Sequence, residues 1–415
     1  MSGAGSYGLI GRKLGHSYSS LIHGLFGVED YRHIELEPEE LAAFLQEERY
    51  NGLNVTIPYK LAVMEYCSEL SDAAREIGAV NTLHRGSDGK LYGHNTDAYG
   101  LQYALERAGI ELSDRKVLVF GSGGASRTCC YLAKRAGARE VRVISRNGQD
   151  NYENLSVHAD AEILINATPV GMYPHPEGLP ADPAEFPHCE GVMDLIYNPC
   201  RTRFLLRAEE LGLRRSDGLP MLVAQAAAAD EIFTGEAIPK ERIEAVLREI
   251  RSRMMNIVLV GMPGSGKSHI GRLLKKMTGR ELFDTDAEIV RKEGRSIPEI
   301  FEAEGEEYFR ALEREAVREA GNGSGRIIVT GGGVVKDERN LEPLRRNGRI
   351  YHLERELSKL SRKGRPLSLA GDLGEMYAER KPMYERFRDV RVKNSGAPQA
   401  AARAIREDMD ENSGD

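Results

Sequence analysis

Short apolar segments alternate with longer segments of helical periodicity along most of the chain. The clearest short segments are 116–120, 141–145, 163–166, 192–195, 257–260 and 327–329. In the segment 239–253, apolar residues recur at the spacing of a helix face: Ile243, Val246, Leu247 and Ile250. Strands that alternate with helices are typical of βαβ units and parallel sheets, so the pattern predicts an α/β fold throughout.

A glycine-rich segment that ends in lysine follows the predicted strand 257–260. It reads Gly261-Met-Pro-Gly264-Ser265-Gly266-Lys267-Ser268 and precedes a helix-compatible run at 269–277. In this context backbone amides cradle phosphates, the lysine reaches the β- and γ-phosphates, and the hydroxyl binds Mg²⁺. The segment predicts a P-loop for ATP, with these nucleotide contacts: Gly264, Ser265, Gly266, Lys267, Ser268 and His269.

Two carboxylates and a run of glycines follow the predicted P-loop. Asp284 and Asp286 end an apolar segment, where positions i and i+2 of a strand would project to the same side. One carboxylate could serve the metal together with Ser268, and the other an acceptor hydroxyl. Three adjacent glycines at 331–333 follow the strand 327–329 and let the backbone approach a ligand closely.

A second glycine-rich turn lies in the first half of the chain. The residues Gly121-Ser122-Gly123-Gly124-Ala125 follow the strand 116–120 and open a helix, where a pyrophosphate can approach the backbone. NAD-binding folds carry an acidic residue about 20 positions further on. Ser145-Arg146-Asn147 stands there instead. The arginine favours NADP over NAD, because it can meet the 2′-phosphate.

Polar residues and a lysine cluster at predicted strand ends within the first hundred residues. The segments are Asn54-Val-Thr56-Ile-Pro-Tyr-Lys60, Gly78-Ala-Val-Asn81-Thr82 and Asn95-Thr96-Asp97. Such side chains can converge on a polyhydroxylated substrate. A lysine that is hydrogen-bonded near an aspartate can also relay a proton to or from a hydroxyl.

Over about residues 5 to 250 the chain resembles shikimate dehydrogenase. The matching motifs include the three polar segments just named, the glycine-rich turn 121–125 and Ser145-Arg146-Asn147. The others are Gly15-His-Ser17-Tyr-Ser19, Asn166-Ala-Thr168-Pro-Val-Gly-Met172, Asp194-Leu-Ile-Tyr197-Asn-Pro and Gln225-Ala. The resemblance implies NADPH-dependent reduction of 3-dehydroshikimate to shikimate. It implies that Lys60, paired with Asp97, is the general acid in reduction and the base in oxidation.

The resemblance also implies the other contacts of the dehydrogenase site. Those to substrate are Ser17, Ser19, Thr56, Lys60, Asn81, Asp97, Tyr197 and Gln225. Those to NADP are Gly121, Ser122, Gly123, Gly124, Ala125, Ser145, Arg146, Asn147, Thr168, Met172 and Gly218.

Over about residues 255 to 395 the chain resembles shikimate kinase. The motifs that carry this resemblance are the P-loop, Asp284-Thr-Asp286, Arg310, the glycines 331–333, Gly364-Arg365-Pro and Arg380. The resemblance implies phosphoryl transfer from ATP to the 3-hydroxyl of shikimate. Asp286 would contact the acceptor hydroxyls and Asp284 the Mg²⁺ shell. Arg310 and Arg380 would clamp the carboxylate beside Gly332 and Gly333, since arginine binds carboxylates in bidentate fashion. Arg365 would sit on a lid over the phosphates, with Lys267 as the other catalytic cation.

These motifs divide the chain into predicted domains. We expect an α/β substrate-binding domain at 1–100, closed by helices of 225–253, and a Rossmann-type NADP-binding domain at 101–224. A P-loop kinase domain with a parallel sheet is expected at 255–397. The remaining 398–415 is expected to be a tail, whose acidic end from Asp408 should be disordered.

Composition indicates the class of protein and the partners that it lacks. The 415 residues carry 29% charged residues and a formal net charge of −7, which gives no sign of a nucleic-acid footprint. No apolar run approaches the roughly 20 residues of a membrane span, and no signal peptide is evident. The five cysteines show no Cys-x-x-Cys pair and are expected to be reduced thiols. We expect a cytoplasmic protein without nucleic-acid or membrane partners. Its oligomeric state stays open.

Three alternatives remain at the level of the sequence. The first half could be a catabolic, NAD-linked quinate/shikimate dehydrogenase fused to a small-metabolite kinase, although Arg146 argues against it. The second half could be another metabolite kinase, such as a gluconate kinase. The chain could also be a catalytically inactive sensor of pathway metabolites, against which the intact Lys60, Asp97, Lys267 and Asp286 argue.

Overall fold

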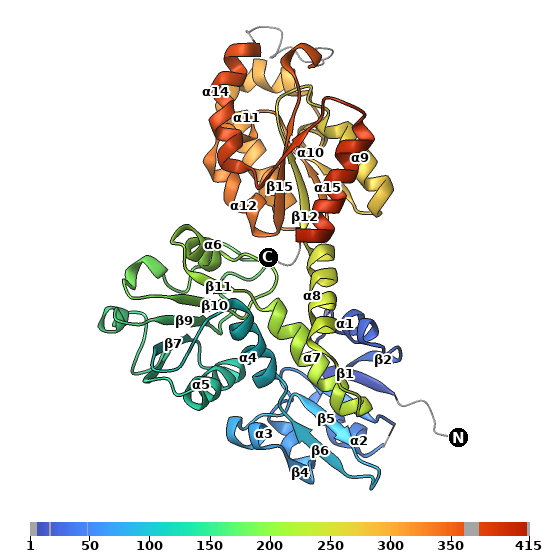
Figure 1. Ribbon diagram of the computed structural model, residues 1–415, viewed down its shortest axis with the longest axis vertical. Helices are drawn as coiled ribbons and strands as arrows, with labels where there is room; N and C mark the ends of the chain where they lie inside the picture. Colours follow the sequence, from blue (N-terminus) through green and yellow to red (C-terminus); the bar gives the residue numbers. More distant parts are fainter. Residues whose placement is uncertain (1–5, 16–17, 48, 361–372, 413–415) are drawn as a thin grey trace. The chain divides into compact units, whose positions relative to one another are not determined.

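A computed structural model describes residues 6–15, 18–47, 49–360 and 373–412 (Figure 1). The chain divides into two compact units. The first contains Met1–Tyr197 and Thr202–Leu247, and the second contains Asn198–Arg201 and Arg248–Asp415. Each unit is described by itself.

A mixed sheet opens the first unit, with the strand order β2-β1-β3-β5-β6-β4. Its strands are β1 (Tyr7–Gly11), β2 (Tyr31–Glu35), β3 (Gly52–Val55), β4 (Glu69–Leu70), β5 (Thr82–Arg85) and β6 (Leu91–His94). The helices of this part are α1 (Ser19–Phe26), α2 (Leu41–Gln46), α3 (Asp72–Ile77), α7 (Leu219–Thr234) and α8 (Lys240–Met254), of which α8 belongs to the first unit as far as Leu247. β1 pairs in parallel with β2 and β3, whereas β5 runs antiparallel to β3 and β6.

The second sheet of this unit is parallel throughout, in the order β11-β10-β9-β7-β8. Its elements are β7 (Lys116–Phe120), β8 (Glu140–Ile144), β9 (Ile163–Asn166), β10 (Gly191–Asp194), β11 (Arg214–Ser216), α4 (Asp97–Ala108), α5 (Gly124–Arg135) and α6 (Arg203–Glu210). Successive residues of β7 serve opposite faces. Val117 and Val119 pack with α4 and α5, and Leu118 and Phe120 pack with α6. Helices on both faces bury this sheet, as parallel sheets require.

A third sheet, again parallel, forms the centre of the second unit in the order β13-β14-β12-β15-β16. Its elements are β12 (Asn256–Val260), β13 (Leu282–Asp284), β14 (Ile327–Val329), β15 (Gly348–Glu354), β16 (Val390–Lys393), α9 (Lys267–Thr278), α10 (Thr285–Glu293), α11 (Ile297–Gly321), α12 (Leu341–Arg346), α14 (Leu373–Phe387) and α15 (Pro398–Asn412). α9 and α15 cover one face, and α11, α12 and α14 cover the other (Figure 1). The prediction of an α/β fold throughout is confirmed.

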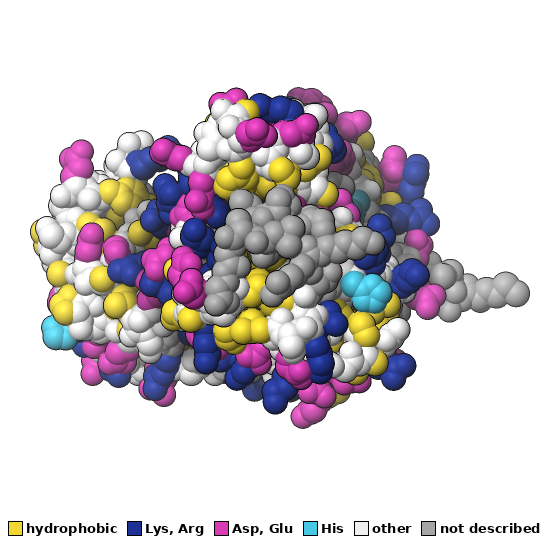
Figure 2. All heavy atoms as spheres, turned by 90° about the horizontal axis from the view of Figure 1, so that it is seen from above, with side chains coloured by type: hydrophobic (Ala, Val, Ile, Leu, Met, Phe, Trp, Pro, Cys, Tyr) yellow, Lys and Arg dark blue, Asp and Glu magenta, His cyan; other side chains and the backbone are white. Residues whose placement is uncertain are grey.

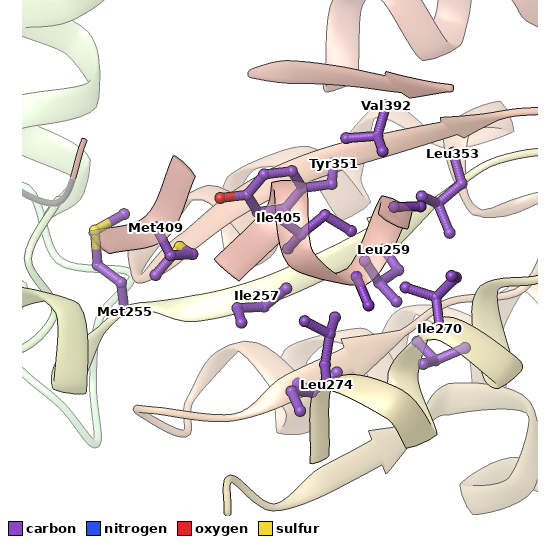
Figure 3. Packing of buried hydrophobic residues seen from close by; sticks show 14 residues of the cluster. Met255, Ile257, Leu259, Ile270, Leu274, Tyr351, Leu353, Val392, Ile405 and Met409 are labelled. Atoms are coloured by element: carbon purple, nitrogen blue, oxygen red, sulfur yellow. The ribbon is translucent and has the colours of Figure 1, made fainter. Parts of the chain in front are cut away.

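As far as it is described, the predicted tail is helical, which differs from the prediction that its end from Asp408 is disordered. α15 continues past Asp408 to Asn412, and its Ile405 and Met409 lie in the core under β12 and β15 (Figure 3). The Asp408 carboxylate accepts hydrogen bonds of 2.6 Å from both Arg349 Nε and the Tyr351 hydroxyl. Apolar residues at helical spacing, and partners for the acid, therefore outweigh the acidic composition of this segment.

The surface of the protein carries charges of both signs, and its cysteines, all of which the structure describes, form no disulfide bond. Basic and acidic side chains are interspersed on the face shown in Figure 2. No helix in the described part of the chain combines the length and the apolar character that crossing a membrane requires. None of the five cysteines, all of them within the described residues, forms a disulfide.

Candidate active sites

In the first unit, the predicted lysine and aspartate are in direct contact. Lys60 follows the cis Ile57–Pro58 peptide after β3, and Asp97 begins α4. Lys60 Nζ donates to Asp97 Oδ2 at 2.5 Å. The side chains are 27% and 15% exposed, so the pair is sheltered yet open to a ligand. A charged pair in this position can exchange a proton with a bound hydroxyl or carbonyl.

Asn81 and Gln225 join this pair from two other elements. Asn81 follows α3, and its Nδ2 donates to Asp97 Oδ1 at 2.9 Å and lies 3.5 Å from Gln225 Oε1. Gln225 comes from α7, where its Nε2 is held by the carbonyl of Leu222 at 2.9 Å. The structure thus brings together four of the residues predicted to contact the substrate.

The remaining predicted substrate contacts come from other elements of the first unit. Thr56 directly follows β3, and its amide donates to the Ile10 carbonyl at 2.9 Å. Tyr197 follows β10, and its ring meets that of Tyr18 edge-on at 6.5 Å between centroids. Ser19, next to Tyr18, is the first residue of α1. Ser17 lies outside the described residues.

The predicted NADP contacts gather where β7, β8, β9 and β10 end. Gly121 has a φ of 106°, and a Cβ there would lie 2.9 Å from Thr168 Cγ2 and 3.0 Å from the Ala167 carbonyl. A Cβ on Gly218 would lie 2.1 Å from the Leu195 carbonyl. Both glycines therefore permit a close approach of backbone segments. The other predicted contacts at this edge are Ser122, Gly123, Gly124, Ala125, Ser145, Arg146, Asn147 and Met172, each of them partly or fully exposed.

A buried carboxylate lies behind this edge, in a residue that belongs to a matching motif but for which no role was predicted. Asp194, fully buried at the end of β10, accepts hydrogen bonds from Thr202 Oγ1 at 2.6 Å and from Asn166 Nδ2 at 3.0 Å. Asn166 Oδ1 in turn accepts the amide and hydroxyl of Thr168. Burial raises the pKa of Asp194 to about 7, although hydrogen bonds from Thr202, the Ile196 amide and Asn166 oppose that rise.

A cavity of 510 Å³ in the second unit collects most of the predicted kinase residues. Those that line it are Gly264, Gly266, Lys267, Ser268, His269, Asp284, Asp286, Arg310, Gly332, Gly333 and Arg380. Arg365 lies outside the described residues. Ser265 faces the interior instead. Its side chain is fully buried and its amide is bound to the Met262 carbonyl, because the loop turns inward there.

The P-loop adopts the conformation that its glycines permit. Gly264 and Gly266 have φ of 85° and 99°. Lys267 Nζ donates to the carbonyl of Gly261 at 2.7 Å, and Ser268 Oγ donates to Asp284 Oδ2 at 3.4 Å.

The two aspartates lie in this cavity for a reason other than the predicted strand geometry. β13 ends at Asp284, whose Oδ1 caps α10 by accepting the amides of Asp286 and Ala287 at 3.1 and 3.2 Å. Asp286 belongs to the first turn of α10. The prediction of two strand residues on one side was therefore wrong in its geometry, whereas both side chains do line the same cavity.

Arginines also line this cavity. Arg310 Nη1 donates to Glu313 Oε2 at 2.7 Å, and Glu313 is buried, which raises its pKa. Arg380 Nη1 donates to the Gly332 carbonyl at 3.1 Å. Arg355, which follows β15, also lines the cavity, and its Nε has no hydrogen-bond partner among the described residues.

Comparisons with known proteins agree with the geometry of the first unit. Residues 9–83 match the family model described as shikimate dehydrogenase substrate binding domain, and residues 218–248 match that of the shikimate 5'-dehydrogenase C-terminal domain. The shikimate dehydrogenase (NADP(+)) of Clostridium beijerinckii is 37% identical over 247 residues, which cover 55% of this chain and 91% of that relative. The chain belongs to the shikimate dehydrogenase family.

Solved structures of shikimate dehydrogenases superpose on the same part of the chain. The chorismate mutase/shikimate 5-dehydrogenase fusion protein from Clostridium acetobutylicum is 38% identical with a TM-score of 0.56, covering 59% of this chain and 97% of that one. Shikimate 5-dehydrogenase from Thermus thermophilus, in complex with NADP(H) and shikimate, is 34% identical with a TM-score of 0.54. It covers 59% of this chain and 99% of that one.

The other part of the chain matches a second enzyme. Residues 263–410 match the family model described as shikimate kinase. With a shikimate dehydrogenase half and a shikimate kinase domain, the chain is a bifunctional enzyme of the shikimate pathway, as the sequence predicted.

Several residues at these sites escaped prediction. Thr96 lies between two quoted residues and donates its amide to Asn81 Oδ1 at 2.7 Å. Its place in the Asn95-Thr96-Asp97 segment could have identified it. Glu313 stands one helical turn beyond Arg310, a spacing that allows an ion pair. For Arg355 the sequence holds no signal, because only the strand order places the end of β15 beside β12.

Proposed function

We propose that the shikimate dehydrogenase half reduces 3-dehydroshikimate to shikimate with NADPH. The contact between Lys60 Nζ and Asp97 Oδ2 carries this proposal. Lys60 would donate a proton to the oxygen that becomes the new hydroxyl and recover it in the reverse reaction. Asp97 would hold the ammonium group, and Asn81 and Gln225 would fix the ring through its hydroxyls. Ser17, Ser19, Thr56 and Tyr197 would complete the substrate site.

The edge of the parallel sheet fits a dinucleotide. Gly123 and Gly124 open α5 and are exposed, with no atom within 4 Å of an added Cβ, so a pyrophosphate could approach their amides. Arg146 is exposed after β8, where it would meet a 2′-phosphate and thereby favour NADPH over NADH. When bound, NADPH supplies the hydride for the carbonyl carbon.

We propose that the shikimate kinase domain transfers the γ-phosphoryl group of ATP to the 3-hydroxyl of shikimate. Lys267 and Arg365 would neutralise charge on the phosphates, and Asp286 would contact the acceptor hydroxyl. Arg310 and Arg380 would bind the carboxylate next to Gly332 and Gly333. Ser268 Oγ and Asp284 Oδ2, which lie 3.4 Å apart, would hold Mg²⁺ together with phosphate oxygens. A nucleotide-bound Mg²⁺ usually has only one or two ligands from the protein.

The product of the first reaction would be the substrate of the second. A one-pot reaction tests this order: purified protein receives 3-dehydroshikimate, NADPH, ATP and Mg²⁺, and products are identified by mass spectrometry. We expect shikimate 3-phosphate, with NADPH and ATP consumed one to one. Shikimate without phosphate would contradict the kinase assignment, and binding without turnover would favour the sensor alternative.

The two activities should be separable by single substitutions. Lys60→Ala removes the proton donor and is expected to lower the reductase kcat by at least about 100-fold, a typical contribution of acid–base catalysis, with the kinase unchanged. Lys267→Ala should abolish the kinase and spare the reductase. Each activity serves as the folding control for the other variant. Loss of both activities in either variant would contradict two independent sites.

The alternatives have less support. An NAD-linked quinate or shikimate dehydrogenase would need a ribose-binding acid where Arg146 stands, so a comparison of NADPH with NADH as cosubstrate separates the two. An inactive sensor would not require a lysine and an aspartate 2.5 Å apart.

A further inference from the structure

A line of buried polar side chains leads from β2 to the Lys60–Asp97 pair. Its members come from β2, β3, β5 and the segment before β5: Tyr31, Asn54, Thr82 and Asn81, all of them buried. Such groups are expensive to bury unless each is hydrogen-bonded. The proposed chemistry does not explain Tyr31, Asn54 or Thr82, because none of them touches Lys60.

The hydrogen bonds along this line run in one direction. The Thr96 amide donates to Asn81 Oδ1 at 2.7 Å, which fixes the amide so that Nδ2 faces Asp97 Oδ1 at 2.9 Å. The Thr82 hydroxyl lies 3.1 Å from Asn81 Oδ1 as a donor and 3.2 Å from the Thr96 hydroxyl, a pair in which either oxygen can donate.

The same direction continues back to β2. Thr82 Oγ1 accepts from Asn54 Nδ2 at 3.3 Å, and Asn54 Oδ1 accepts the Tyr31 hydroxyl at 2.7 Å. With Thr82 donating to Asn81 Oδ1, each donor from Tyr31 to Asn81 points toward the Asp97 carboxylate. Hydrogen bonds in such a chain polarise one another, and hydrogen bonds to a carboxylate favour its ionised form.

Contacts with two helices fix Tyr31, the first residue of the line. The Tyr31 ring stacks on His23 with centroids 3.9 Å apart, and His23 Nδ1 lies 2.6 Å from Asp230 Oδ1. His23 and Asp230 come from α1 and α7, and both are 1% exposed. Burial raises the pKa of Tyr31 well above its ordinary value, so its hydroxyl stays a neutral donor over the working pH range.

We propose that Tyr31 is a positioning residue of the reductase, which orients Asp97 and thereby Lys60 through Asn54, Thr82 and Asn81. The inference rests on the proposed function, in which Lys60 and Asp97 handle the proton. Besides Lys60, the buried Cys129 thiol of α5 interacts electrostatically with Asp97, and burial raises the pKa of that thiol. Burial lowers the pKa of His94, which ends β6 three residues before Asp97. Both stay neutral near pH 7, so Lys60 is the charged partner that the line acts on.

The test compares Tyr31→Phe with Tyr7→Phe, because each removes one hydroxyl from a tyrosine of the same sheet. Tyr7 lies on β1 directly opposite Tyr31, but its ring stacks on Phe233 and its hydroxyl donates to the Phe233 carbonyl at 3.3 Å, which is not a member of the line. Tyr31→Phe is expected to lower the reductase kcat about 10-fold, within the range that misplaced catalytic groups cost, and to move the acidic limb of the kcat–pH profile toward neutral pH. The KM for NADPH and the kinase rate should not change. Tyr7→Phe should match the wild type.

Two results would overturn the inference. One is a Tyr31→Phe enzyme with the kcat and pH profile of Tyr7→Phe, which would leave the line a purely structural role. If Tyr31→Phe fails to fold, as judged by loss of NADP⁺ binding with the kinase intact, Thr82→Val breaks the line in its middle. An unchanged pH profile in that variant is the second overturning result. A wild-type protein without reductase activity would instead overturn the proposed function itself.

Discussion

At the scale of a single residue, the buried Asp194 carboxyl should make the stability of the dehydrogenase half depend on pH. Its pKa is about 7 in the folded protein, whereas an unfolded aspartate titrates near its ordinary value of about 4. Between these values the folded state binds a proton that the unfolded state has lost. The free energy of unfolding therefore falls as pH rises from about 4 to 7 and is level above that.

Asp194→Asn removes this dependence, because asparagine does not titrate. Between about pH 5 and pH 7.5 the wild type should lose about 2 to 3 kcal/mol more stability than the variant, equivalent to a difference of several degrees in Tm. The measurement is the Tm of the NADP-responsive transition at both pH values for both proteins. Parallel curves would show that Asp194 is ionised in the folded protein as well as in the unfolded one over this pH range.

At the scale of the element, α7 begins where its backbone touches the end of β10. A Cβ on Gly218 would lie 2.1 Å from the Leu195 carbonyl, a backbone atom that cannot move away cheaply. Gly218→Ala should therefore cost about 1 to 3 kcal/mol, the usual range for overpacking, and should weaken NADP⁺ binding at this edge. Calorimetric titration with NADP⁺ and a thermal melt measure both effects.

Gly24 offers the matched control, because it is exposed on α1 with nothing within 4 Å of an added Cβ. Gly24→Ala should raise stability by up to about 1 kcal/mol through helix propensity alone. Equal effects of the two substitutions would mean that the contact with Leu195 relaxes without cost.

Elements with a strong pattern were predictable from the sequence. The segments 116–120 and 163–166 are strands with the predicted bounds, because fully buried parallel strands read as continuous apolar runs. α15 was missed, because charged residues such as Asp408 mask the apolar spacing of Ile405 and Met409. The fold buries that stripe on a sheet whose strands lie far away in the sequence.

The residues of the candidate sites also fall into those that could be predicted and those that could not. Residues in contiguous segments, such as Lys60 and the P-loop lysine Lys267, could be identified because local sequence fixes their chemistry. Asp194 and Tyr31 could not, because their importance depends on partners brought close by the fold. Thr202 lies eight residues beyond Asp194 and Asn54 lies 23 residues beyond Tyr31, and nothing in the local sequence indicates either hydrogen bond.

At the scale of the whole molecule, the core clusters each lie within one of the two compact units. The cluster around Val117 and Leu101 belongs to the first unit, and the cluster around Ile257 and Ile405 belongs to the second (Figure 3). Since cooperativity follows a shared core, we expect the units to unfold in two separate transitions.

Ligands should identify these transitions one at a time. A ligand at about 100 times its Kd stabilises the unit that binds it by about 2.7 kcal/mol, which raises Tm by about 5 to 10 °C for a unit of this size. In differential scanning calorimetry, NADP⁺ should move one transition and ADP with Mg²⁺ the other. Lys267→Ala should weaken only the response to ADP. A single transition that responds to both ligands would mean that the two enzymes unfold together, and stability could then no longer be assigned to either half.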